Sequence, residues 1–342
     1  MATLSKTPQD ASTPAPVLAV ENLSVSFRQE EGLTTPVREV SLHVGKGETV
    51  ALVGESGSGK SVTSLAVMGL LPRPAGFVSA GQIRFLTRAG RMMDLATLPF
   101  AEARLLRGRE IAMIFQEPMT SLNPVLTIGE QIAETVRLHL GLSGRALQAH
   151  VRAQLDLVEI PDAGRRMDDY PHQMSGGMRQ RVMIALAMAC NPSLLIADEP
   201  TTALDVTIQA QILLLIDRLR RETGMAVLFI THNLGVVAEI ADRVSVMYAG
   251  QVVETAATQP LFQKPRHPYT QALLSCLPAR AKADAQGIKR LQPIAGQPGL
   301  FGKACAFAPR CQFADDECNS DAPSLETLAD GSVRCLRWRA LA

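Results

Sequence analysis

The sequence predicts an α/β fold with a largely parallel β-sheet and a helical insertion. Between about residues 17 and 255, apolar strand-like runs alternate with amphipathic helical runs, as in parallel sheets covered by helices. A glycine-rich loop at residues 54–61 joins a buried apolar run to a helical pattern. Between about residues 117 and 190, three helical patterns follow one another without a convincing strand, which predicts the insertion.

The chain is expected to divide into three parts. Residues 1–16 are rich in Ser, Thr and Pro and lack the apolar core of a signal peptide, which predicts a flexible tail. Residues 17–260 carry the α/β pattern. From about residue 261 to 342 the sequence becomes Pro- and Cys-rich with little periodicity, so we expect a small Cys-rich C-terminal domain.

Composition limits the classes of function. With 46% hydrophobic residues the chain can bury a large core, and a net charge of +1 does not favour nucleic acid as a partner. No apolar run approaches the roughly 20 residues that a membrane-spanning helix needs. The expected location is therefore the cytoplasm.

The glycine-rich loop has the pattern of a phosphate-binding site. Its glycines let backbone N–H groups turn toward a polyphosphate, and the following helix adds positive potential at its N-terminus. The lysine can reach the β- and γ-phosphates, and the serine after it can bind Mg²⁺. A surface loop rich in Gly and Ser is the alternative. The loop consists of Gly54, Glu55, Ser56, Gly57, Ser58, Gly59, Lys60 and Ser61.

Two acidic residues follow another buried strand. The run SLLIADEP places Asp198 and Glu199 at the carboxyl edge of the sheet, where the glycine-rich loop is also expected. Asp198 is suited to hold Mg²⁺ through water, and Glu199 to polarise a water for attack on the γ-phosphate. The alternative is a pair of solvated acids in a turn. His232, after the run MAVLFIT, is expected at the same edge, although a histidine after a strand is often structural.

A second helix start has features of an anion site. Ser175, Gly176 and Gly177 precede a long helical pattern, with Ser175 as the expected N-cap and unpaired backbone N–H groups beyond it. The alternative is an ordinary capped helix. Since one nucleotide needs one phosphate loop, a second anion-seeking helix start predicts a composite site that another subunit closes.

Four cysteines crowd into the C-terminal part of the chain. Cys305, Cys311, Cys318 and Cys335 have the spacing C-x5-C-x6-C-x16-C, whereas Cys190 and Cys276 lie in apolar helical contexts. A cytoplasmic location argues against disulfides, and four thiolates match the ligand count of structural Zn²⁺ or a [4Fe–4S] cluster. Free thiols are the remaining alternative.

Five motifs follow one another along the chain: the glycine-rich loop, MSGGMRQR, LLIADEP, TALD and FITHN. In this order they resemble the motifs of the ATP-binding subunit of an ABC transporter, over about residues 17–260. The resemblance implies that the loop is a Walker A loop that binds ATP, and that Asp198 binds Mg²⁺. It further implies that Glu199 is the general base. Gln116 would bind Mg²⁺ and sense it together with the attacking water, and His232 would contact the γ-phosphate.

The same resemblance assigns residues on the opposing side of an ATP. Ser175 to Met178 correspond to the signature that contacts the ATP of the partner subunit, although Met174 and Met178 depart from the common Leu and Gln. Asp205 corresponds to the D-loop aspartate. Phe27 corresponds to the aromatic residue that stacks on adenine, with a core phenylalanine as the alternative.

The C-terminal part resembles the oligopeptide and dipeptide importer branch of this family, on the runs KPRHPYTQALLSCLP, LQPIAGQPG and CAFAPRC. This implies ATP-driven import of peptides or related solutes such as glutathione or nickel. The implied partners are two membrane permeases, a second related ATPase and an external solute-binding protein, at the cytoplasmic face of the inner membrane. The four cysteines resemble the C-terminal cysteine set of that branch, and this resemblance implies that they hold a [4Fe–4S] cluster. A soluble ABC ATPase that acts on nucleic acid or the ribosome is the alternative.

Overall fold

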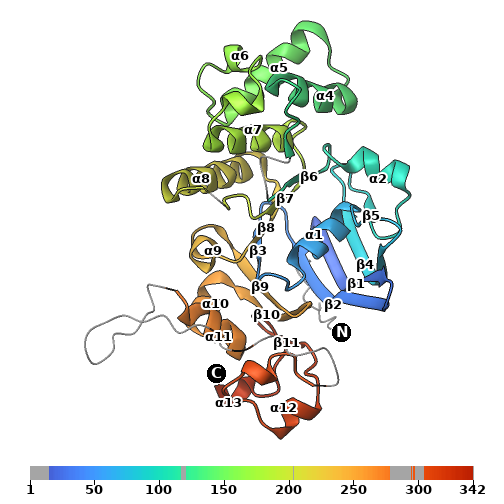
Figure 1. The fold of residues 1–342 in the computed structure, drawn as a ribbon, viewed down its shortest axis with the longest axis vertical. Coiled ribbons are helices and arrows are strands. Elements are labelled where there is room, and N and C mark those ends of the chain that lie inside the picture. Colours follow the sequence, from blue (N-terminus) through green and yellow to red (C-terminus); the bar gives the residue numbers. More distant parts are fainter. Residues whose placement is uncertain are drawn as a thin grey trace, which may run out of the picture.

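The computed structural model describes residues 15–116, 121–202, 204–277, 294, 296 and 304–341. The expected tail lies outside these residues except for its last two positions. Most of the run LQPIAGQPG also lies outside them. The described chain contains two β-sheets and a group of helices at one end (Figure 1).

The larger sheet has eight strands in the order β11-β12-β10-β9-β3-β8-β7-β6. Its centre is parallel, and the strands β3, β8 and β7 are buried along their whole length, as expected for a sheet covered on both faces. Strands β10, β12 and β11 continue the sheet with antiparallel pairing. The bounds are β3 Thr49–Val53, β6 Ile111–Ile114, β7 Leu194–Asp198, β8 Ala226–Thr231, β9 Arg243–Tyr248, β10 Gln251–Ala257, β11 Glu326–Leu328 and β12 Gly331–Val333.

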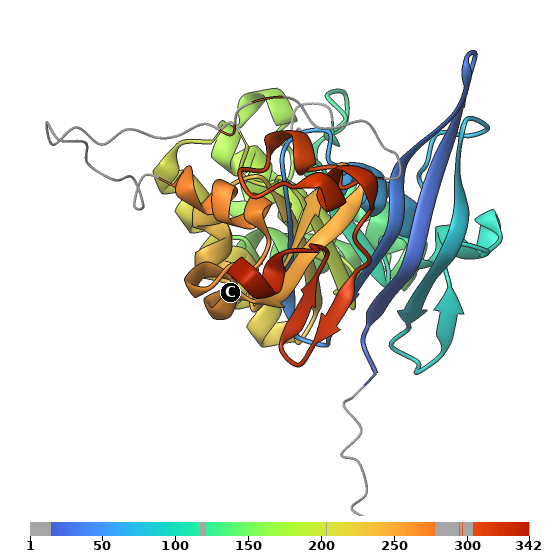
Figure 2. The ribbon, with the colours of Figure 1, turned by 90° about the horizontal axis from the view of Figure 1, so that it is seen from below.

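The smaller sheet is antiparallel, which the sequence pattern did not predict. Its order is β2-β1-β4-β5, and it stands beside the larger sheet (Figure 2). Strands β1 and β2 are joined by a short turn, so the alternation of strands and helices begins only after β3. The bounds are β1 Leu18–Gln29, β2 Gly32–Val44, β4 Gly76–Leu86 and β5 Met92–Asp94.

The helices divide into two groups. Helices α4 to α7 gather at one end of the molecule, as expected for the helical insertion, and pack around a shared apolar core that includes Ile132, Val151 and Ile184 (Figure 1). The others flank the sheets. The bounds are α1 Lys60–Met68, α2 Phe100–Leu106, α4 Ile128–Leu140, α5 Gly144–Leu157, α6 Ala163–Arg166, α7 Gly176–Met188, α8 Val206–Thr223 and α9 Leu234–Ile240.

The C-terminal region packs directly on the larger sheet. Strand β12 pairs with β10, so residues 331–333 extend the larger sheet, whose strand β3 leads into the glycine-rich loop (Figure 2). An apolar cluster of Tyr248, Leu261, Tyr269 and Phe307 joins this region to β9. The division into domains at residue 260 stays a prediction. The bounds are α10 Thr258–Gln263, α11 Pro268–Ser275, α12 Asp316–Ser320 and α13 Trp338–Leu341.

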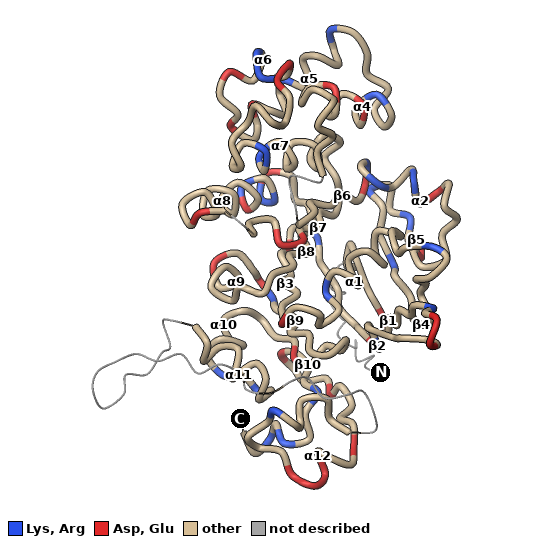
Figure 3. Tube along the Cα trace, viewed as in Figure 1, with Lys and Arg blue, Asp and Glu red and all other residues tan. Residues whose placement is uncertain are grey.

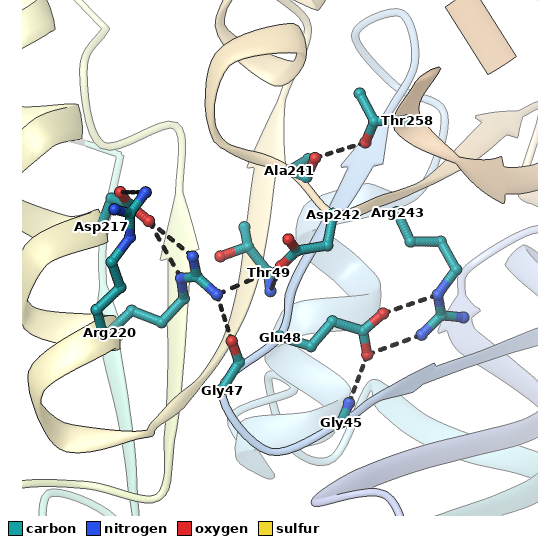
Figure 4. A network of polar contacts seen from close by, with 11 residues as sticks. Gly45, Gly47, Glu48, Thr49, Asp217, Arg220, Ala241, Asp242, Arg243 and Thr258 are labelled. Atoms are coloured by element: carbon teal, nitrogen blue, oxygen red, sulfur yellow. Dashed lines mark hydrogen bonds and ion pairs between the residues drawn. The ribbon is translucent and has the colours of Figure 1, made fainter. Parts of the chain in front are cut away.

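A polar network holds the start of the central strand (Figure 4). Asp242 accepts a hydrogen bond from the Thr49 backbone N–H at 2.8 Å, and Arg220 of α8 contacts Asp242 and the Gly47 carbonyl. Arg243 donates to both oxygens of Glu48 at 2.9 and 3.1 Å. These pairs fix the register of β3 against its neighbours, and β3 leads into the glycine-rich loop.

The single tryptophan lies in the C-terminal region. Trp338 donates its indole N–H to Glu326 Oε2 at 2.8 Å. The guanidinium groups of Arg266 and Arg339 lie 5.8 and 5.0 Å from the ring centre of Trp338, within reach of a cation–π attraction. These contacts tie the last described helix to the residues before α11.

Charges of both signs are spread over the whole fold (Figure 3). Each helix in the described part of the chain is too short or too polar to span a lipid bilayer.

Candidate nucleotide site

The glycine-rich loop connects β3 to α1, as the sequence predicts. Gly54 has a φ of +155°, and a Cβ there would lie 2.2 Å from the Met247 carbonyl oxygen, so only glycine fits. Gly59 adopts the left-handed conformation as the N-cap residue of α1. The backbone can therefore bend around an anion while the N-terminus of α1 points into the bend.

Lys60 lies inside the loop and is only 5% exposed. Its Nζ donates to the carbonyl oxygens of Gly54 and Glu55 at 2.8 and 2.9 Å. Burial lowers the pKa of the ammonium group, although the nearby carboxylates of Glu199 and Asp198 oppose this shift. The lysine is thus held among the groups that a phosphate would approach.

Asp198 ends strand β7 and faces the first turn of α1. Its two carboxylate oxygens lie 3.4 Å from the hydroxyls of Ser61 and Ser64, which donate to them. Burial raises the pKa of this carboxyl group, which is 4% exposed. A carboxylate and a hydroxyl side by side are oxygen ligands of the kind that Mg²⁺ prefers, so Asp198 and Ser61 fit this ion. Ser64 was not among the predicted residues.

Glu199 is the centre of a second cluster at the same sheet edge. Gln116 Nε2 and the Thr202 hydroxyl donate to its Oε2 at 3.1 and 3.0 Å, and His232 Nδ1 lies 3.0 Å from its Oε1. Burial works to raise the pKa of Glu199, but the hydrogen bonds from His232 and Thr202 outweigh it and the pKa lies below its ordinary value. The carboxylate is therefore ionised near neutral pH and able to accept a proton.

The backbone of Glu199 is strained. Its φ is +47°, in the left-handed region that non-glycine residues rarely adopt, at a cost on the order of 1 kcal/mol or more. Such strain is typical of functional positions. The structure thus brings together Gln116, Glu199 and His232, which lie far apart in sequence. Thr202 joins them and was not predicted.

Ser175 precedes α7, which lies in the group of helices at one end of the molecule (Figure 1). Its hydroxyl accepts a hydrogen bond from the Met178 backbone N–H at 3.3 Å, so it is the N-cap that the sequence predicts. Ser175 and Gly176 are both exposed. Asp205 is likewise an N-cap, of α8, and accepts from the Ile208 backbone N–H at 2.9 Å. The roles of these residues toward a second subunit stay predictions.

Phe27 is partly buried near the end of β1. Its ring lies against Gly76, where an added Cβ would come within 2.8 Å of it, and it packs on the apolar core of the smaller sheet. Adenine stacking by this ring stays a prediction.

The C-terminal region contacts the glycine-rich loop through Tyr269 and Arg310, neither of which was predicted to lie at the site. The Tyr269 hydroxyl accepts from the Glu55 backbone N–H at 2.9 Å, and Arg310 donates to both Glu55 carboxylate oxygens at 2.7 and 2.9 Å. Tyr269 also packs on Tyr248 and Phe307, with ring centres 4.5 and 5.4 Å away. These pairs join segments more than 200 positions apart, and local sequence patterns carry no signal for such contacts.

The four C-terminal cysteines line one small pocket together with His267 and Phe307. None of the four is in a disulfide. Burial raises the pKa of the Cys311 and Cys318 thiols, and that of Cys335 to about 11. Four sulfur donors fit a [4Fe–4S] cluster or Zn²⁺ by their chemistry. Within the described residues, however, no three His, Cys, Asp or Glu side chains are grouped closely enough to form a metal site.

Comparison with known proteins places this geometry in a family. The family model described as "ABC transporter" matches residues 37–202, and the model described as "Oligopeptide/dipeptide transporter, C-terminal region" matches residues 253–318. A model described as an AAA domain, putative AbiEii toxin, matches residues 168–238. The ATP-binding cassette MJ0796, in a dimeric post-hydrolysis state bound to ADP and Pi, shares 27% identity with a TM-score of 0.62 over 70% of this chain and 98% of that chain.

Two relatives extend the comparison to the C-terminal region. A putative peptide import ATP-binding protein of Brucella ovis is 53% identical over 96% of this chain and 98% of its own length. The glutathione import ATP-binding protein GsiA of Pectobacterium atrosepticum is 56% identical over 82% of this chain and 45% of its own length. The chain therefore belongs to the ABC transporter family of ATP-binding proteins and carries the C-terminal region of the oligopeptide/dipeptide transporters.

Proposed function

We propose that this chain hydrolyses ATP to energise import of dipeptides, oligopeptides or related solutes through a pair of membrane permeases. The observation that carries the proposal is the position of Glu199 between Gln116 and His232, beside Asp198 at the sheet edge that also holds the glycine-rich loop. The match of the C-terminal region to oligopeptide and dipeptide transporters supports the solute class.

The residues fit in-line attack of water on the γ-phosphate. Glu199 accepts a proton from the water while the water oxygen forms a bond to the γ-phosphorus. The bond from the γ-phosphorus to the β,γ-bridging oxygen breaks, which releases ADP and leaves inorganic phosphate. Lys60 and His232 stabilise charge on the transferred phosphoryl group. Mg²⁺, when bound with the nucleotide at Ser61 and Asp198, would neutralise phosphate charge. Gln116 donates to Glu199 and so orients the general base.

We propose further that the site is completed across a dimer with a second, related ATPase chain. The exposed N-terminus of α7 at Ser175 and Gly176 would face the ATP of the partner, and Asp205 would lie near the same interface. The relative MJ0796 forms a dimer, which supports this arrangement. The dimer would lie against two permeases at the cytoplasmic face of the membrane, with an external binding protein delivering solute.

The test is purification of the chain from its native membrane, followed by reconstitution into liposomes with whatever accompanies it. We expect two permeases, a second ATPase, and ATP-dependent uptake from a panel of dipeptide, oligopeptide, glutathione and nickel. The member of the panel that is taken up identifies the solute. Recovery with ribosomes or nucleic acid, and no permease, would contradict the importer function and favour a soluble ABC ATPase.

We propose that Cys305, Cys311, Cys318 and Cys335 hold a [4Fe–4S] cluster with a structural role, with Zn²⁺ as the alternative occupant. Their convergence on one pocket without disulfides supports four-thiolate ligation. Ligation would require deprotonation of thiols whose pKa values burial now raises, and a bound cation supplies the compensating charge.

Anaerobic purification tests the cluster directly. We expect about four iron per chain and a broad visible absorbance, both lost in Cys311→Ser, as for a cluster held by four thiolates. Cys276→Ser, which changes a cysteine outside the pocket, serves as the control and should retain the iron. Stoichiometric zinc without colour, or four thiols that react freely, would contradict the iron assignment.

A further inference from the structure

Glu55 lies within the glycine-rich loop, and each of its polar groups has a partner in the protein. Its carbonyl oxygen accepts from Lys60 Nζ at 2.9 Å and from the Ser58 backbone N–H at 3.2 Å. Its backbone N–H and its carboxylate are instead bound by Tyr269 and Arg310. The C-terminal region therefore supplies two of the three sets of contacts that fix this residue.

The contact with Arg310 has the geometry of a strong ion pair. Two nitrogens of the guanidinium each bind one carboxylate oxygen, at 2.7 and 2.9 Å, which is the bidentate arrangement that fixes both distance and orientation. The Arg310 side chain is only 4% exposed, whereas that of Glu55 is 33% exposed. Arg310 is further held by the Ile294 carbonyl at 3.1 Å and by the Tyr248 hydroxyl at 3.3 Å.

The charge of Glu55 makes this pair relevant to nucleotide binding. A carboxylate within a loop that surrounds phosphates would repel them, because like charges at short range disfavour one another. Arg310 neutralises that charge from the side of the C-terminal region. It also holds the carboxylate in one place, so the side chain is not able to turn into the concave side of the loop.

Tyr269 acts on the backbone of the same residue. Its side chain is fully buried between Tyr248 and Phe307, which fixes the position of the hydroxyl. That hydroxyl receives the Glu55 N–H, so the first bend of the loop has a defined direction. Gly54, the preceding residue, packs against the Met247 carbonyl and leaves the bend little room to shift.

We infer that Arg310 and Tyr269 are positioning residues for nucleotide binding, through which the C-terminal region holds the phosphate-binding loop and neutralises Glu55. The inference rests on the proposed ATP site. It assigns the C-terminal region a part in nucleotide affinity, in addition to any role in solute class.

The first test compares Arg310→Gln with Arg266→Gln in the full chain within the purified transporter. Arg266 also forms a bidentate ion pair in the C-terminal region, with Asp330, but does not contact the loop. For Arg310→Gln we expect the Kd for Mg-ATP to rise about tenfold with kcat within about twofold, since the loss concerns binding. Arg266→Gln should leave the Kd unchanged.

A double-variant cycle separates charge neutralisation from simple loss of packing. In the background of Glu55→Gln there is no carboxylate to neutralise, so adding Arg310→Gln should change the Kd by no more than about twofold. Tyr269→Phe keeps the ring and removes the hydroxyl, and it should raise the Kd about threefold to fivefold, as expected for one lost hydrogen bond. Melting temperatures of all variants show whether they fold.

The outcomes are distinct. An unchanged Kd in Arg310→Gln, or an equally large effect of Arg310→Gln when Glu55 is already Gln, would overturn the inference. If Arg310→Gln does not fold, Tyr269→Phe decides the question by the same measurement. A wild-type transporter that neither binds nor hydrolyses ATP would instead overturn the proposed function itself.

Discussion

The two helix starts that the sequence marks as anion sites are built very differently. The start of α1 is enclosed: Gly54 packs on β9, Glu55 is held by Arg310 and Tyr269, and Lys60 is buried. The start of α7 is open, with Ser175 exposed and bonded only to its own helix among the contacts described for it. The α1 start is therefore surrounded by contacts from other segments, whereas the α7 start is exposed.

This difference predicts separate roles for the two helix starts in nucleotide binding. The α1 start has the lysine, the oxygen ligands for Mg²⁺ and a rigid loop, so it should bind nucleotide within one chain. The α7 start offers exposed backbone N–H groups and the Ser175 hydroxyl, and these groups would contact a phosphate only where another surface brings it. Four experiments test this division.

The largest effect is expected at Glu199. Glu199→Gln should lower kcat by about 100-fold or more while the Kd for ATP stays within about threefold, because a general base is lost and the binding groups remain. Glu130→Gln, which alters a glutamate paired with Arg137 on α4, is the control and should keep normal turnover. Steady-state hydrolysis at saturating ATP in the assembled transporter measures kcat. Near-normal turnover would show that another group takes the proton.

Substitution of Gly54 and of Gly57 by alanine separates two effects: backbone strain at positive φ, and the close contact of the loop with β9. Gly54→Ala would place a Cβ 2.2 Å from the Met247 carbonyl oxygen, so the loop must move. We expect a loss of about 2–3 kcal/mol in the free energy of unfolding, with weaker ATP binding. Gly57→Ala, also at positive φ but with open space around its Cβ, should cost only about 1 kcal/mol. Denaturant titration compares them, and equal losses would contradict the close packing of the loop.

The region that supports the α1 start also carries a pH dependence. His267 is buried and burial lowers its pKa to about 3, while the unfolded chain has the ordinary value of 6.5. As the pH falls below 6.5, the unfolded state binds a proton that the folded state does not, so stability decreases. Between about pH 7.5 and about pH 5.5 we expect a loss of about 1 kcal/mol.

His267→Asn removes the titration and keeps an N-cap for α11. Urea unfolding measures the free energy of unfolding at both pH values. In this variant the loss of about 1 kcal/mol attributed to His267 should disappear. The same slope in both proteins would assign the pH dependence to other groups.

The smallest effect on the isolated chain is expected at the α7 start. Ser175→Ala removes an N-cap and should cost about 1 kcal/mol of stability, as should Thr127→Ala at the start of α4. Neither should alter ATP affinity of the chain alone. Only Ser175→Ala should reduce turnover once the transporter is assembled, and equal turnover in both variants would contradict a role across the interface.

The local sequence pattern was sufficient to predict where the residues at strand ends lie. Asp198, Glu199 and His232 directly follow buried apolar runs, and carboxyl ends of parallel strands meet at one edge, so their convergence with the glycine-rich loop was predictable. The expected N-cap at Ser175 is confirmed for the same reason, because capping depends on neighbouring residues.

Contacts between distant segments were not predictable in this way. Arg310 and Glu55 are 255 positions apart, and nothing near either residue indicates the other. The antiparallel sheet of β1, β2, β4 and β5 was missed because alternating apolar runs do not reveal whether a turn or a helix joins two strands. Thr202 and Ser64 reach the acidic residues through turn and helix geometry that has no distinctive sequence signature.

Trp338 gives the chain an intrinsic optical probe. Because it is the only tryptophan, light that excites indole but not tyrosine reports on the C-terminal region alone. Its indole N–H and ring face are held by Glu326, Arg266 and Arg339, so its emission should move to longer wavelength when those contacts open. Emission recorded during unfolding, beside far-ultraviolet circular dichroism of the whole chain, would show whether the C-terminal region opens together with the two sheets or before them.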